Sequence, residues 1–119
     1  MRIAVTSQGN ETSSQVDPRF GRAQWFIVVD TETGEHEAHD NAQNLNAVQG
    51  AGVQAAQNVA GLRVQAVLTG NCGPKAFRVL EAAGIRVCLG ATGTVQSAVE
   101  RMMAGECNAA DGPNVQGHW

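Results

Sequence analysis

Three short loops, rich in glycine and small polar residues, have the composition of an anion-binding site. They are Ser7-Gln8-Gly9-Asn10, Gly70-Asn71-Cys72-Gly73 and Gly90-Ala91-Thr92-Gly93-Thr94. The second and third lead directly into predicted helices, so each is expected to present unpaired backbone N–H groups and the positive end of a helix dipole. Glycine also lets a ligand approach the backbone closely. The alternative is that these glycines only make short turns between strands and helices.

Three basic residues could add positive charge to this site. Lys75 is the only lysine in the chain and falls in the first turn of a helix that begins at Pro74. A cation there is disfavoured by the helix dipole unless an anion is bound nearby. Arg19 and Arg22 precede a long apolar strand and could reach the same end of the sheet. For each residue alone, a solvated side chain is the simpler interpretation.

Cys72 is the candidate for thiol chemistry. Its position before a helix predicts a lowered pKa and some thiolate character, suited to a nucleophile or a soft metal ligand. Cys72 and Arg78 also have the Cys-x5-Arg spacing of phosphatases and arsenate reductases. A helix starting at Pro74 leaves little room for a loop that wraps a phosphate, and Val79 stands where a hydroxyl residue is usual. A cysteine-dependent enzyme acting on an oxyanion is therefore the least favoured alternative.

The other potential metal ligands show no ligand spacing. His36 and His39 are three apart on a predicted strand and face opposite sides, so zinc is not expected. Cys88 and Cys107 bring the cysteine count to three, an odd number without a Cys-x-x-Cys pair. We therefore expect both to be reduced, buried and inert thiols.

Hydrophobic periodicity predicts the elements that position these loops. Strands are expected at 2–6, 24–30, 35–40, 64–69 and 85–89, and helices between Gly50 and Gly61, from Pro74 to just before Gly84, and over 95–103. The resulting order, β-β-β-α-β-α-β-α, predicts a three-layer α/β domain with a five-stranded mixed sheet and helices on both faces. The polar 35–40 strand suits a sheet edge. The residues expected to face inward on the helices are Val53, Ala56, Val59, Ala60, Ala76, Phe77, Leu80, Ala83, Val95, Ala98, Val99, Met102 and Met103.

Size and charge exclude several classes of protein. The chain has 119 residues and a mass of 12.4 kDa, which predicts a single domain over 1–119 with about 106–119 as a C-terminal tail. A net charge of −3 gives no basic face for nucleic acid or anionic lipid. No apolar run reaches the ~18 residues that span a bilayer, and no signal-peptide layout is present. We expect a cytoplasmic protein.

Several motifs together resemble a known family, the small accessory domains of nitrogenase iron–molybdenum cofactor biosynthesis, and its free-standing single-domain members in particular. The motifs occur in the same order nearly from end to end of the chain. They are Phe20-Gly21-Arg22-Ala23, Gly50-Ala51-Gly52, Gly70 with Gly73-Pro74-Lys75-Ala76-Phe77, Gly90-Ala91-Thr92-Gly93-Thr94-Val95, and Asp111-Gly112-Pro113-Asn114 with Gly117-His118. Many relatives carry a histidine before Gly-Ala-Gly, where this chain has Gln49.

The resemblance implies a ribonuclease-H-like fold and a non-catalytic carrier that binds a molybdenum–copper sulfide cluster without covalent attachment. An iron–molybdenum–sulfur cluster precursor is the alternative cargo, and partner proteins would donate or receive it. Such a cluster is a polyanion, which suits backbone N–H groups and a few cations, and soft copper makes Cys72 a candidate metal contact. A protein-interaction module without cofactor remains open. The expected binding residues are Arg19, Arg22, Gly70, Asn71, Cys72, Gly73, Lys75, Thr92, Gly93 and Thr94.

Overall fold

A computed structural model describes residues 1–41 and 51–107, and these contain five strands and three helices. The order of elements is the predicted one, with boundaries shifted by at most two residues. The 64–69 strand, for example, is shorter at Ala66–Leu68. The elements are β1 (Arg2–Ser7), β2 (Trp25–Asp30), β3 (His36–Asp40), α1 (Ala51–Ala60), β4 (Ala66–Leu68), α2 (Pro74–Ala82), β5 (Arg86–Cys88) and α3 (Val95–Met103).

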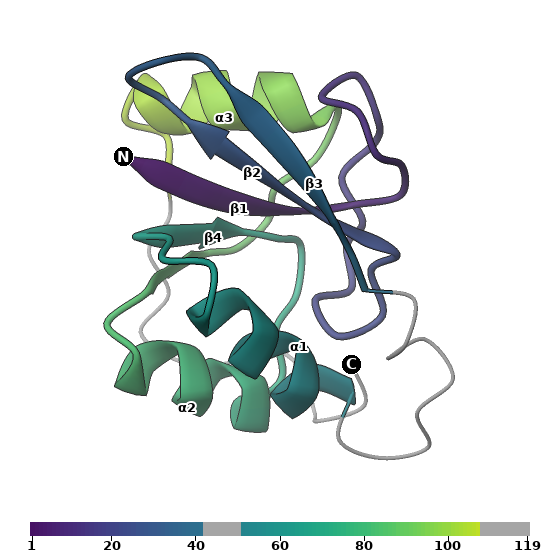
Figure 1. Ribbon diagram of the computed structural model, residues 1–119, viewed down its shortest axis with the longest axis vertical. Helices are drawn as coiled ribbons and strands as arrows, with labels where there is room; N and C mark the ends of the chain where they lie inside the picture. The colour runs from purple at the N-terminus through teal and green to yellow at the C-terminus, as the bar shows by residue number, and fades with distance from the viewer. Residues whose placement is uncertain (42–50, 108–119) are drawn as a thin grey trace.

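The five strands form one mixed sheet in the order β3-β2-β1-β4-β5. β1 lies at its centre, antiparallel to β2 and parallel to β4 (Figure 1). β4 and β5 are also parallel, as their crossover through α2 predicts. The β2–β3 hairpin extends one edge, and β3 is almost entirely exposed. The predicted polar edge strand is confirmed.

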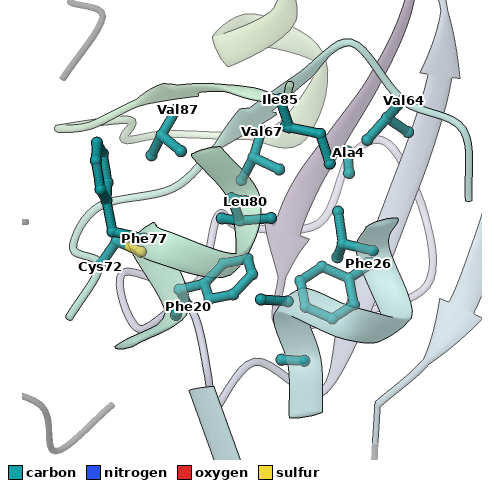
Figure 2. Close-up of a cluster of buried hydrophobic side chains, with 14 of the residues drawn as sticks. Ala4, Phe20, Phe26, Val64, Val67, Cys72, Phe77, Leu80, Ile85 and Val87 are labelled. Carbon is teal, nitrogen blue, oxygen red and sulfur yellow. The ribbon is translucent and has the colours of Figure 1, made fainter. Parts of the chain in front are cut away.

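Helices cover both faces of the sheet, with α3 on one side and α1 and α2 on the other (Figure 1). Alternate side chains of each strand point to opposite faces, so the strands contribute side chains to two separate cores. Ala4, Val28 and Val67 pack toward α1 and α2 in a cluster that also holds Phe20 and Phe26 (Figure 2). Their neighbours along the strands pack against α3, and these are Ile3, Val5, Ile27, Ala66 and Leu68.

Most of the predicted inward helical residues are buried, with two corrections at helix ends and one within α1. Ala83 is exposed because α2 stops at Ala82 and the chain turns away through Gly84, whose φ is +74°. Met103, in the last turn of α3, is 58% exposed. In α1, Ala55 is buried whereas Val53 is only half-buried. The buried face of this helix is therefore rotated about the helix axis relative to the predicted face.

The prediction that Cys88 and Cys107 are reduced thiols is wrong, because the two form a disulfide. Their Cα atoms lie 5.6 Å apart. The bond joins the end of β5 to the segment that follows α3, two places brought together only by the packing of α3 on the sheet. The odd cysteine count arises because Cys72 lies outside this pair.

Two features of the sequence lie outside the described residues: Gln49, and the segment from Asp111 to Trp119. No helix within the described ranges is long and apolar enough to cross a membrane.

Reduction of the disulfide is expected to destabilise the fold. The bond spans 19 residues of sequence, and closing a loop of that length contributes about 3 kcal/mol through the entropy of the unfolded chain. Urea unfolding with and without reductant measures the difference. The doubly substituted Cys88→Ser, Cys107→Ser chain is the control and should not respond to reductant. An unchanged wild-type midpoint would contradict the prediction.

Candidate functional site

One long segment between β1 and β2, residues 8–24, lies across the carboxyl ends of the parallel strands; we call it the crossing segment. Its middle pairs with the loop that follows β4. The Asn71 N–H donates to the Pro18 carbonyl at 2.7 Å, and the Phe20 N–H donates to the Asn71 carbonyl at 3.2 Å. Arg19 thereby pairs with Asn71 as in a parallel strand. The structure thus places the backbone of Arg19 beside the 70–73 loop.

The earlier part of the crossing segment pairs with the loop after β5. The Val16 N–H donates to the Gly93 carbonyl at 2.9 Å, and Gln15 and Thr94 form an antiparallel bridge. Both glycine-rich loops are therefore held by the same stretch of chain. Their positions at this edge of the sheet depend on its hydrogen bonds.

A buried polar cluster fixes the crossing segment to the sheet. The Thr6 hydroxyl, at the end of β1, lies 2.6 Å from the Asp17 carbonyl oxygen and 2.9 Å from Oγ1 of Thr69. The Asp17 N–H donates back to the Thr6 carbonyl at 2.9 Å. Thr6 and Thr69 are fully buried, and Asp17 is 3% exposed. Sequence reasoning missed this cluster, although a threonine ending each of two apolar strands was a visible signal.

Gly70 is required by the protein's own backbone. A Cβ atom there would lie 2.7 Å from the Cα of Pro18 and 2.9 Å from its carbonyl oxygen. The sequence predicts that Gly70 lets a ligand approach the backbone. The contact with Pro18 explains this glycine without a ligand. Its role is to let the crossing segment pass directly over the end of β4.

The N-terminus of α3 has no donor left for a ligand in its first turn. The Val95 and Gln96 N–H groups donate to the Ser14 and Thr12 carbonyls, each at 2.9 Å. Thr94 caps the helix, because its Oγ1 accepts from the Ser97 N–H at 3.1 Å. The prediction that this terminus offers unpaired N–H groups is wrong. The Thr92 carbonyl, in turn, accepts from the Arg101 guanidinium.

The N-terminus of α2 is open by comparison. Gly73 occupies the N-cap position and has no side chain to cap the helix, and Pro74 has no N–H. Within residues 1–41 and 51–107, no hydrogen bond engages the N–H groups of Lys75 and Ala76. The Lys75 side chain is exposed. This end of α2 therefore combines unused donors with a cation.

Cys72 is not the reactive thiol that its position predicted. It is fully buried, in the same core cluster as Phe20 and Phe77 (Figure 2). Burial raises the pKa of the Cys72 thiol to about 12, because an apolar surrounding disfavours the thiolate. The helix dipole does not overcome this desolvation. A cysteine nucleophile paired with the exposed Arg78 is therefore contradicted, and so is a surface thiolate that ligates a metal.

The two predicted arginines differ in their surroundings. Arg19 is exposed and pairs with the buried carboxylate of Asp17, with Nε 3.4 Å from Oδ1. The same oxygen accepts from the Arg19 backbone N–H at 2.9 Å. Part of the Arg19 charge is therefore balanced within the protein. Arg22 is half-buried.

The described residues contain no group of side chains that could coordinate a metal ion together. Over residues 1–41 and 51–107, no three His, Cys, Asp or Glu side chains are grouped to hold a metal ion. What the described residues offer at the start of α2 is two backbone N–H groups and the positive charge of Lys75.

Comparison with known proteins identifies the family. The family model described as dinitrogenase iron-molybdenum cofactor matches residues 1–105. The chain belongs to this family. It is 46% identical to the orange protein of Desulfovibrio gigas, solved in its apo form, with a TM-score of 0.93 and 96% of each chain covered. A Thermotoga protein provisionally assigned as NifB is 34% identical, with a TM-score of 0.84 and 98% of each chain covered. An uncharacterized protein of Methanocaldococcus jannaschii is 31% identical over 108 residues, covering 89% of this chain and 88% of that protein.

Substitution of Gly70 tests its role in this family member. Gly70→Ala should lower the free energy of unfolding by about 1–3 kcal/mol, because the new methyl group overlaps the Pro18 backbone. Gly61→Ala is the matched control, since its Cβ would meet nothing closer than the Asn58 carbonyl at 3.4 Å. Urea denaturation measures both variants. Equal stability of the two would contradict the close approach.

Thiol modification tests the burial of Cys72. At pH 9, the ordinary pKa of a thiol, only about one thousandth of a group with a pKa of about 12 is ionised. Iodoacetamide at that pH should leave Cys72 unmodified in the oxidised, folded protein and label it in urea, as read by peptide mass spectrometry. Labelling of the folded protein as fast as of the unfolded chain would show an accessible thiolate.

Proposed function

We propose that this chain is a non-catalytic carrier of an anionic metal–sulfide cluster, held without covalent attachment beside the N-terminus of α2. The cargo proposed is a molybdenum–copper sulfide cluster, with an iron–molybdenum–sulfur precursor as the alternative. Membership of the dinitrogenase iron-molybdenum cofactor family and the likeness to the orange protein support a cofactor-binding or carrier role. Partner proteins would supply and receive the cluster.

The observation that carries the proposal is the contrast between the two helix N-termini. Thr94 caps the α3 terminus and the crossing segment accepts from its N–H groups, whereas the N–H groups of Lys75 and Ala76 in α2 have no acceptor among the described residues. A polyanion placed there would receive the helix dipole, two backbone donors and the Lys75 ammonium group together. The binding set proposed is therefore Gly73, Lys75 and the adjacent Asn71, with Arg19 and Arg22 as neighbouring charges.

The donor chemistry suits a cluster that is already assembled. In an assembled metal–sulfide cluster the sulfides would already coordinate the metals, so the protein would need to supply no ligand atom. Cys72 takes no part in direct contact in this proposal, because its thiol is buried and protonated. Burial of the Cys72 thiol leaves the described residues 70–73 without an accessible cysteine nucleophile, which supports carriage in this proposal.

The ribonuclease-H-like classification belongs to the same proposal. The strand order β3-β2-β1-β4-β5, in which β2 alone runs against the other four strands, supports it.

Substitution of Lys75 tests the site. Lys75→Ala should weaken binding of a cluster reconstituted anaerobically from tetrathiomolybdate and copper roughly tenfold, as loss of one charge-assisted contact implies. Titration followed by the visible absorption of the bound cluster gives the dissociation constant. Added salt should weaken wild-type binding more than binding by the variant.

Arg78→Ala is the matched control, because Arg78 is an exposed cation on the same helix, one turn beyond Lys75. It should bind the cluster nearly as well as wild type. Equal weakening by both substitutions would show a response to net charge alone. No weakening by Lys75→Ala would place the cluster elsewhere.

A further inference from the structure

A small cavity lies beside the disulfide, on the face of the sheet that α3 covers. Its volume is about 40 Å³, and Cys88, Cys107, Met102 and Arg101 are among the residues that line it. The cavity borders the apolar core between the sheet and α3. Two cysteines and a neighbouring methionine therefore line one small, partly open cavity that is large enough for a single ion.

We propose that the reduced form of this pair is a binding site for a thiophilic monovalent cation of the Cu(I) type. Reduction breaks the S–S bond, takes up two electrons and two protons, and leaves two thiols; a dithiol reductant supplies both and becomes a disulfide. Binding of Cu(I) then releases the two protons to solvent and forms two S–Cu bonds. The site is separate from the proposed cluster site and does not depend on the proposed function.

The set of donors selects the kind of ion. Two thiolates, with a thioether close by, are soft ligands, and soft ligands favour Cu(I). Zn²⁺ in proteins requires about four ligands arranged tetrahedrally. Glu106 also lines the cavity, but over residues 1–41 and 51–107 no three His, Cys, Asp or Glu side chains are grouped to hold a metal ion. A low-coordinate soft cation therefore fits where zinc does not.

The charge of the site is also accommodated. Two thiolates and one Cu(I) leave a single net negative charge. The Arg101 side chain lines the same cavity and also donates to the Thr92 carbonyl. Glu106 lines the cavity too, but it is exposed, so its carboxylate can stay in solvent. A guanidinium beside the sulfurs stabilises their ionised form and the bound complex.

The two sulfurs differ in access, which sets the order of reduction. Cys88 is 2% exposed, whereas Cys107 is half-buried in the segment after α3. An attacking thiolate can reach the Cys107 sulfur first, so that Cys88 leaves as the thiolate. Cys88, fixed in β5, and Cys107, on the non-helical segment, can then separate to admit the ion.

The test compares the oxidised and reduced forms of the same chain. The reduced protein, freed of reductant under anaerobic conditions, is titrated with Cu(I) against bicinchoninate. We expect the reduced wild type to withdraw one equivalent more than the oxidised wild type, and Cys88→Ser with Cys107→Ser to lose that equivalent. A parallel titration with Zn²⁺ should show no tight binding. Equal Cu(I) uptake by the oxidised and reduced forms, or equally tight Zn²⁺ binding, would overturn the proposal.

Met102→Leu distinguishes a folded site from a flexible dithiol. It keeps the size and apolar character of the side chain and removes only the sulfur, so weaker Cu(I) binding by the reduced variant supports the cavity. Tryptophan fluorescence reports whether the reduced proteins remain folded. Undiminished affinity in Met102→Leu, or an unfolded reduced wild type that still binds Cu(I), would show that the cavity does not form the site.

Discussion

The hydrogen bonding of the crossing segment to the ends of three strands is the constraint on which this molecule depends. Parallel strands end with polar backbone groups at one edge of the sheet, and these groups need partners when they are buried. Residues 8–24 provide many of them, through Pro18 to the β4 loop, through Val16 to the β5 loop and through Ser14 to the start of α3. The buried Thr6–Asp17–Thr69 cluster anchors the segment. The shape of the edge follows from this pairing.

The same constraint gives the glycine-rich loops different roles. Gly70 admits the backbone of the crossing segment, and the N–H groups of the α3 terminus are used up by it. The α2 terminus receives no such partner within the described residues and keeps Lys75 at the surface. Two loops that look equivalent in sequence therefore differ in what they can bind. A charged cargo is expected to select the one whose donors remain unused.

Local patterns were sufficient to predict the order of elements, the mixed sheet, its polar edge and the family resemblance. They act through periodicity and turn chemistry, which are properties of neighbouring residues. Features set by packing could not be predicted in this way. The Cys88–Cys107 bond requires α3 to dock beside β5, and the pKa of Cys72 depends on the core around it rather than on the helix it precedes. Likewise, the α3 donors are consumed by Thr12 and Ser14, which are about eighty residues away in sequence.

The central claim is that the chain carries a metal–sulfide cluster as cargo. Anaerobic purification from the native source, with a visible spectrum and molybdenum, copper, iron and sulfide analysis of one sample, tests it most directly. The account predicts a coloured protein with stoichiometric molybdenum and sulfide, and the copper-to-iron ratio then identifies the cluster. A colourless native protein that also takes up no thiomolybdate with copper would contradict the account and favour an interaction module.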